Sequence, residues 1–176
     1  GRINIIGEHT DYNDGYVLPG AIDKTITFKL GKNNTEKCCR IYSKGFGDVL
    51  EFDLDSITKK PKGWENYVLG VLHEILQRTH KLKGFDCTIE SHLPVGSGVS
   101  SSAALECGLA IGLNALFDLG LTKWEIIALS QTAEHEFVGT KCGIMDQFAS
   151  VMGKKDHVMF LDCMTLDFEY IPMDIE

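Results

Sequence analysis

Apolar positions recur with a helical period in four parts of the chain. Residues 64–80 carry apolar side chains at Tyr67, Val68, Val71 and Leu72 and again one turn later, which predicts an amphipathic helix. Residues 102–117 are apolar on nearly all sides, and this pattern is typical of a buried helix. We expect two further helices, an amphipathic one over 122–139 with Thr122 as its N-cap and a short one over 143–153.

Alternating or β-branched segments predict strands before, between and after these helices. Residues 85–94 alternate, so that Phe85, Cys87 and Ile89 share one face. Residues 16–30 follow the turn signal Asn13-Asp14-Gly15 and predict one strand or the two halves of one ribbon. Shorter strands are predicted at 38–43, 49–54, 157–163 and 166–173.

The order of these elements is strands, helix, strand, three helices, strands. This order predicts an α+β fold rather than a regular parallel βαβ alternation. The 176 residues are enough for one domain with its own core, and we expect a single domain over 1–176. The chain starts at Gly1 instead of a methionine and stops at Glu176, which suggests a fragment trimmed at both ends.

Composition narrows the classes of partner. A formal charge of −8 disfavours nucleic acid and anionic membranes, so a bound polyanion would need local donors and a divalent metal. No apolar run is long enough to cross a bilayer. Six scattered cysteines without a C-x-x-C motif suit free thiols in a reducing cytoplasm better than disulfides or a zinc site.

The stretch LPVGSGVSSSAALE, residues 93–106, has the composition of a phosphate-binding loop. Gly96 and Gly98 permit close backbone approach to a ligand, and three serines follow just before a strong helix former. A helix start presents unpaired N–H groups and a partial positive charge, which favour phosphate. The common G-x-x-x-x-G-K-[ST] pattern is absent. Taken alone, the loop is nearly as well explained by a strand-to-helix turn with a serine cap.

Two other stretches concentrate polar chemistry. GRINIIGEHTDYNDG, residues 1–15, gathers Arg2, Glu8, His9 and Asp11, which could surround the hydroxyls of a sugar or form an exposed charged turn. CGIMDQ places an acid, Asp146, in an apolar neighbourhood. Another acid, Glu134, lies upstream in AEHEF, and each of these two acids taken singly is more often structural.

Together the stretches GRINIIGEHTDYNDGYVLPGAID, LPVGSGVSSSAALE and AEHEFVGTKCGIMDQF closely resemble the galactokinase family of the GHMP small-molecule kinases. WENYVLGV and HVMFLDC are similar to that family too, so the resemblance runs over essentially the whole chain. It implies the N-terminal domain of a GHMP kinase, with a mixed β-sheet packed against helices. It also implies ATP-dependent phosphorylation of galactose at its anomeric hydroxyl by a monomeric cytoplasmic enzyme.

The resemblance assigns roles residue by residue. Asp146 matches the residue usually assigned as base, and Arg2 the catalytic arginine beside it. A free aspartate is a weak base for a sugar hydroxyl, so proton removal is expected to lag behind bond breaking. The sugar-binding positions are matched by Glu8, His9, Asp11, Gly143 and Asp146. The triphosphate-binding motif is matched by Gly96, Ser97, Gly98, Ser100, Ser101 and Ser102. The Mg²⁺ ligands are matched by Ser102 and Glu134. Trp64 falls near the position of the family's adenine pocket.

The chain departs from the family pattern in three places. Met164 stands where an arginine is common, Lys141 stands where the family more often has an uncharged residue, and the family's C-terminal half is absent. Two alternatives to a galactokinase stay open at this point. An N-acetylgalactosamine kinase is disfavoured by GEHTDYNDG, and a non-catalytic sugar sensor is disfavoured by the intact SSSAA.

Overall fold

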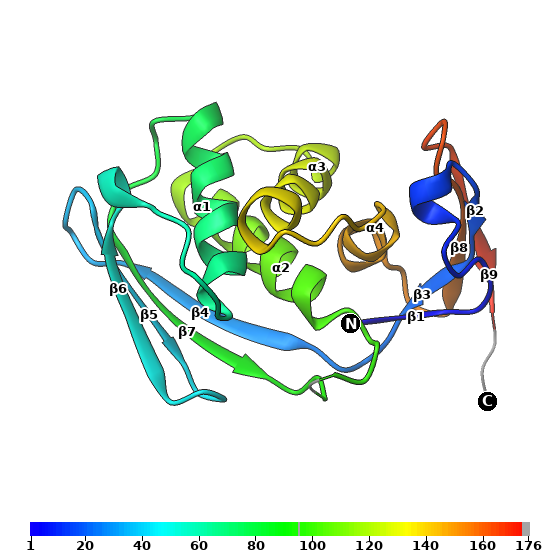
Figure 1. Ribbon diagram of the computed structural model, residues 1–176, viewed down its shortest axis with the longest axis horizontal. Coiled ribbons are helices and arrows are strands. Elements are labelled where there is room, and N and C mark those ends of the chain that lie inside the picture. Colours follow the sequence, from blue (N-terminus) through cyan, green and yellow to red (C-terminus); the bar gives the residue numbers. More distant parts are fainter. Residues whose placement is uncertain (95, 174–176) are drawn as a thin grey trace.

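The computed structural model describes residues 1–94 and 96–173, and it shows two β-sheets with a layer of helices between them (Figure 1). Val95, in the predicted phosphate loop, lies outside the described residues. The order of strands, helix, strand, three helices and strands is as predicted. The α+β fold class, with mixed β-structure packed on helices, is therefore confirmed.

A four-stranded mixed sheet forms one side of the molecule. Its strands, in spatial order, are β4 (Ile26–Lys32), β7 (Phe85–Ser91), β5 (Cys38–Ser43) and β6 (Asp48–Asp53). β5 runs parallel to β7, and the other two pairings are antiparallel. The alternation predicted for β7 is observed, because Phe85, Cys87 and Ile89 are all buried.

The helices cover one face of this sheet (Figure 1). They are α1 (Glu65–Arg78), α2 (Ser101–Phe117), α3 (Lys123–Ala133) and α4 (Met145–Met152). α2 packs on β4 and on the three other helices, so it lies at the centre of the core. The buried helix predicted over 102–117 is thus confirmed. Among the described residues, no helix is both long and apolar enough to cross a membrane.

A five-stranded sheet stands at the other end of the helical layer, next to α4 (Figure 1). It consists of β1 (Arg2–Asn4), β3 (Pro19–Ala21), β8 (His157–Asp162), β2 (Tyr16–Val17) and β9 (Phe168–Pro172). The ribbon predicted over 16–30 was wrong in its extent. The segment forms three separate strands, with interruptions at Leu18 and between Ala21 and Ile26. β2 and β3 belong to this sheet, and β4 belongs to the other. Strand β1 was not expected, because three residues are too few to show a period.

The helix predicted over 122–139 also differs from the observed structure. Thr122 does cap it, with a reciprocal capping box to Glu125, but α3 ends at Ala133. A π-helical turn, Glu134–Val138, continues it, and the amide of Gly139 donates to the carbonyl of Glu134 at 2.9 Å. Such wider turns are often found at functional sites.

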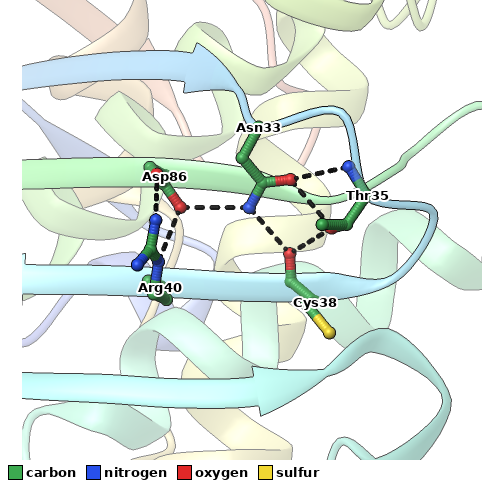
Figure 2. A network of polar contacts seen from close by, with 5 residues as sticks. All are labelled: Asn33, Thr35, Cys38, Arg40 and Asp86. Carbon is green, nitrogen blue, oxygen red and sulfur yellow. Dashed lines mark hydrogen bonds and ion pairs between the residues drawn. The ribbon is translucent and has the colours of Figure 1, made fainter.

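The outer face of the four-stranded sheet carries a polar network, drawn in Figure 2. Arg40 on β5 pairs with Asp86 on β7 at 2.7 Å, and Asn33 donates to Asp86 at 3.0 Å. Asn33 also donates to the carbonyl of Cys38 at 3.0 Å and accepts from both the amide and the hydroxyl of Thr35. The network fixes the connection from β4 to β5 onto the sheet.

Candidate active site

Arg2 and Asp146, which are 144 positions apart in sequence, form an ion pair. The Nε of Arg2 lies 2.6 Å from Oδ1 of Asp146, and the two side chains are only 14% and 23% exposed. Arg2 belongs to β1, and Asp146 lies in the first turn of α4. A helix start favours a carboxylate, and the guanidinium of Arg2 places the opposite charge beside it. The structure therefore brings together the two residues predicted to be catalytic.

The predicted phosphate loop lies against this pair. Nη1 of Arg2 donates to the carbonyl of Gly98 at 2.7 Å, and the hydroxyl of Ser100 donates to Oδ2 of Asp146 at 2.5 Å. Gly96 and Gly98 both have a φ of +73°, which favours glycine. The hydroxyl of Ser97 donates back to the carbonyl of Pro94. The loop ends at Ser101, the first residue of α2.

Asp11 lies near Asp146, whose charge acts on it. It begins the 3₁₀ helix η1 (Asp11–Asn13), and a Cβ built at Gly143 would stand 2.1 Å from its Oδ2. Only glycine at 143 therefore leaves room for this carboxylate. Burial, followed by the charge of Asp146, raises the pKa of Asp11, and backbone amides including that of Met145 partly oppose the rise.

Glu8 and His9 occupy the same loop but are engaged elsewhere. Glu8 accepts from Asn4 at 2.9 Å. Nδ1 of His9 lies 2.6 Å from the hydroxyl of Tyr12, with His9 in a left-handed conformation at φ +62°. Among the described residues, no hydrogen bond joins either side chain to Asp146. Their predicted contact with a sugar stays a prediction.

Glu134, a predicted Mg²⁺ ligand, is 5% exposed at the start of the π-helical turn. Its Oε2 accepts from Nε2 of Gln147 at 2.9 Å. Burial raises the pKa of Glu134, while the nearby side chains of Cys142 and Ser102 partly oppose the rise. Ser102 and Glu134 thus lie next to each other, as their predicted role requires. Gln147, in the quoted CGIMDQ motif, was not predicted to take part.

Glu106 is a further acid near Glu134, and the sequence analysis did not identify it. It lies on α2 and is completely buried, and neither carboxyl oxygen has a hydrogen-bond partner among the described residues. Burial, followed by the charge of Glu134, raises the pKa of Glu106 to about 10. The only sequence signal was its place one helical turn after Ser102, on the side of α2 that carries Ala103 and Cys107 into the core.

Trp64, the predicted neighbour of an adenine pocket, precedes α1 and stacks on Phe46. The ring centroids are 5.8 Å apart and the planes differ by 1°. The indole Nε1 is buried and has no hydrogen-bond partner in the part of the chain that the structure describes. Phe46 itself is 58% exposed in the turn between β5 and β6. The predicted adenine contact stays a prediction.

The described parts of the chain hold no cluster of three or more His, Cys, Asp or Glu side chains that could bind a metal by themselves. Ser102 and Glu134 offer two oxygen ligands for a metal ion, and the buried acid Glu106 is a neighbour of Glu134. Mg²⁺ commonly takes one or two protein oxygens and completes its shell with phosphate and water. The donor set therefore fits Mg²⁺ held jointly with a phosphorylated ligand.

The ion pair of Arg2 with Asp146, the nearby carboxylate of Asp11 and the glycine-serine loop before α2 thus lie together in one site. Residues 66–154 match the model of the GHMP kinases N terminal domain, and the chain belongs to the GHMP kinases. Residues 1–32 match the galactokinase galactose-binding signature. This second match covers Arg2, Glu8, His9 and Asp11, which sequence reasoning had grouped.

Similar sequences include several galactokinases. The chain is 45% identical over 176 residues to a galactokinase of Thermosipho africanus and 46% identical over 172 residues to one of Pyrococcus furiosus. These alignments cover 100% and 98% of the chain but 48% of each relative, so the chain spans about half the length of the curated relatives it matches.

Solved structures share the fold. The Lactococcus lactis galactokinase complexed with galactose matches all of the chain with a TM-score of 0.94 and 40% identity, over 46% of its own length. A mevalonate kinase, at 22% identity, matches 97% of the chain with a TM-score of 0.75 over 54% of its length. At that identity, the second likeness shows the fold alone.

Proposed function

We propose that this chain forms the sugar- and phosphate-binding half of a galactokinase, which transfers the γ-phosphoryl group of ATP to the anomeric hydroxyl of galactose. The observation that carries the proposal is the Arg2–Asp146 ion pair, held against a glycine-serine loop at a helix start. The galactose-binding signature over residues 1–32 supports galactose as the acceptor. We further propose a single domain over 1–176 in a monomeric enzyme. The six unpaired thiols support the expected cytoplasmic location.

In this reaction the anomeric oxygen forms a bond to the γ-phosphorus and the bond to the bridging β,γ-oxygen breaks. ADP leaves, and the hydroxyl proton passes to Asp146. Positioning and charge neutralisation dominate phosphoryl transfer, because its transition state is loose. Arg2 orients Asp146 and adds positive charge beside the acceptor oxygen. Asp11 lies close enough to Asp146 to feel its charge, and Gly143 packs against the side chain of Asp11. Both residues are proposed to bind the sugar, together with Glu8 and His9.

The loop from Gly96 to Ser102 is proposed to bind the triphosphate, and Trp64 to border the adenine. Ser102 and Glu134 would hold Mg²⁺, which when bound neutralises phosphate charge. A hard cation with oxygen ligands suits this pair, since the buried carboxylate of Glu134 lies beside the hydroxyl of Ser102.

The test is the exchange Asp146→Ala. It should lower turnover about 10²- to 10⁴-fold, because the sugar hydroxyl loses the group that takes up its proton. ATP binding should persist. The exposed acid Asp48, exchanged to alanine, serves as the matched control and should leave turnover unchanged. Undiminished turnover in the Asp146 variant would contradict the assignment.

The acceptor is tested by ATP consumption with galactose, N-acetylgalactosamine and no sugar. Galactose alone should stimulate consumption. Stimulation by N-acetylgalactosamine would favour a kinase for that sugar. Sugar-dependent binding to a partner protein without ATP consumption would favour a sensor.

A further inference from the structure

Ser100 holds an unusual place at the start of α2. It is the N-cap residue, yet its hydroxyl accepts no hydrogen bond from the first turn of the helix. Its backbone is left-handed, with φ +55° and ψ +55°, and the residue is 9% exposed. Serine normally serves as an N-cap by accepting a backbone N–H, from an extended conformation. Ser100 does neither of these things.

The hydroxyl of Ser100 is instead directed to the predicted base. It donates to Oδ2 of Asp146 at 2.5 Å, a charge-assisted bond from a nearly buried group. A left-handed non-glycine residue and a missing cap each disfavour the folded state. Arrangements of this kind persist where the surroundings impose them, and they cluster at functional sites.

The bond closes a ring between the loop and the ion pair. Arg2 donates to Oδ1 of Asp146 and also to the carbonyl of Gly98, two positions before Ser100. The loop therefore holds both members of the pair. Among the described residues other than the chain neighbours of each glycine, no atom lies within 4 Å of a Cβ built at Gly96 or Gly98, so this side of the loop is open.

Asp146 in this state accepts strong hydrogen bonds on both of its oxygens, Oδ1 from Arg2 and Oδ2 from Ser100. A carboxylate oxygen that already accepts such a bond is a weaker acceptor for a second. A sugar hydroxyl that must donate to Asp146 therefore competes with the hydroxyl of Ser100.

We propose that Ser100 is a positioning residue that couples occupation of the loop to the availability of Asp146. With the loop empty, its hydroxyl holds Oδ2. When a triphosphate occupies the loop, that hydroxyl turns to a phosphate oxygen and leaves Oδ2 to the acceptor hydroxyl of the sugar. Nucleotide and sugar then favour each other's binding, reciprocally and to the same extent. This inference rests on the proposed function.

The experiment measures the dissociation constant of galactose by titration calorimetry, without and with a non-hydrolysable ATP analogue and Mg²⁺. In the parent protein the analogue should tighten galactose binding about fivefold or more. In Ser100→Ala, galactose without nucleotide should bind nearly as tightly as the parent does with it, and the ratio of the two constants should approach one. Ser56 is an exposed serine in the 3₁₀ helix Leu54–Ser56, which follows β6 of the four-stranded sheet. Ser56→Ala should keep the parent ratio.

Ser100→Gly provides a second variant, since glycine adopts the left-handed conformation freely and also lacks the hydroxyl. If the hydroxyl is the cause, both variants lose the coupling. The inference fails if the parent binds galactose without coupling or if Ser100→Ala retains it. It also fails if the ratio falls because the nucleotide-bound affinity drops. A parent that binds no galactose under either condition overturns the proposed function itself.

Discussion

At the scale of single residues, acidic side chains outnumber basic side chains in the candidate site. The acids are Asp11, Asp146, Glu134 and Glu106, and Arg2 pairs with Asp146. Burial, followed by the charge of Asp146, raises the pKa of Asp11. A triphosphate adds more negative charge to this environment. The arrangement therefore requires cations beyond Arg2, which is consistent with the proposed Mg²⁺.

Glu106 supplies a pH-dependent prediction. Its pKa in the folded chain is about 10, above the ordinary 4.5, so the folded state retains a proton that the unfolded state loses. Stability must then fall as pH rises from about 4.5, with a slope approaching 1.4 kcal/mol per pH unit for one proton. Glu106→Gln, which cannot ionise, should show a flatter profile between pH 5 and 8 and unfold at higher denaturant concentration at pH 8.

Urea unfolding at several pH values measures this difference. Glu136→Gln, an exposed glutamate, is the control and should follow the parent profile. Identical profiles for the parent and Glu106→Gln would show that the buried carboxyl does not retain its proton.

At the scale of elements, the start of α3 is well defined by local chemistry. Thr122 and Glu125 cap each other, with the amide of Glu125 donating to the Thr122 hydroxyl at 3.2 Å and the amide of Thr122 to Glu125 at 2.7 Å. Thr122→Ala should lower the free energy of unfolding by about 1 kcal/mol. Chemical denaturation measures the change, with the exposed loop residue Thr58 exchanged to alanine as the control. Equal losses in the two variants would contradict a capping role.

Sequence patterns predicted these elements to different degrees. α1, α2 and α4 appear with ends within two residues of the predicted ones, because the apolar pattern of a helix is a local signal. The division of residues 16–30 between two sheets was not predictable, since strand pairing depends on distant partners such as β8. The π-helical turn at Glu134–Val138 leaves the amphipathic pattern almost unchanged, so it was missed too.

The site divides in the same way. The residue types were found from motifs and a family resemblance, and the Arg2–Asp146 pair then appeared in the structure. The contacts of Ser100 with Asp146 and of Gln147 with Glu134 depend on how separate elements pack, and no spacing in the chain encodes them.

At the scale of the whole molecule, the site joins the five-stranded sheet to the helical layer. Arg2 comes from the five-stranded sheet, while Asp146 and the loop residue Ser100 come from the helical layer (Figure 1). A ligand that contacts both sides should therefore hold the sheet and the helices together.

Galactose should accordingly raise the melting temperature. At a concentration 100 times its dissociation constant, binding adds about 2.7 kcal/mol. For a chain of this size, that corresponds to roughly 5–10 °C. Asp11→Asn should reduce the shift by weakening sugar binding. Differential scanning fluorimetry measures it, with glucose as the control sugar. A shift of equal size with both sugars would contradict a galactose-specific site.

The sequence separation of Arg2 and Asp146 has a consequence for how the protein is made. A ribosome adds about 5–20 residues per second, so Arg2 leaves the exit tunnel many seconds before its partner is synthesised. During that time the glycine-serine loop is translated as well, and neither the loop nor the arginine has its carboxylate. The helices before α4 can pack early, through contacts that are close in sequence. The candidate site is therefore among the last parts of the chain to take its final form, since it is incomplete until α4 has emerged.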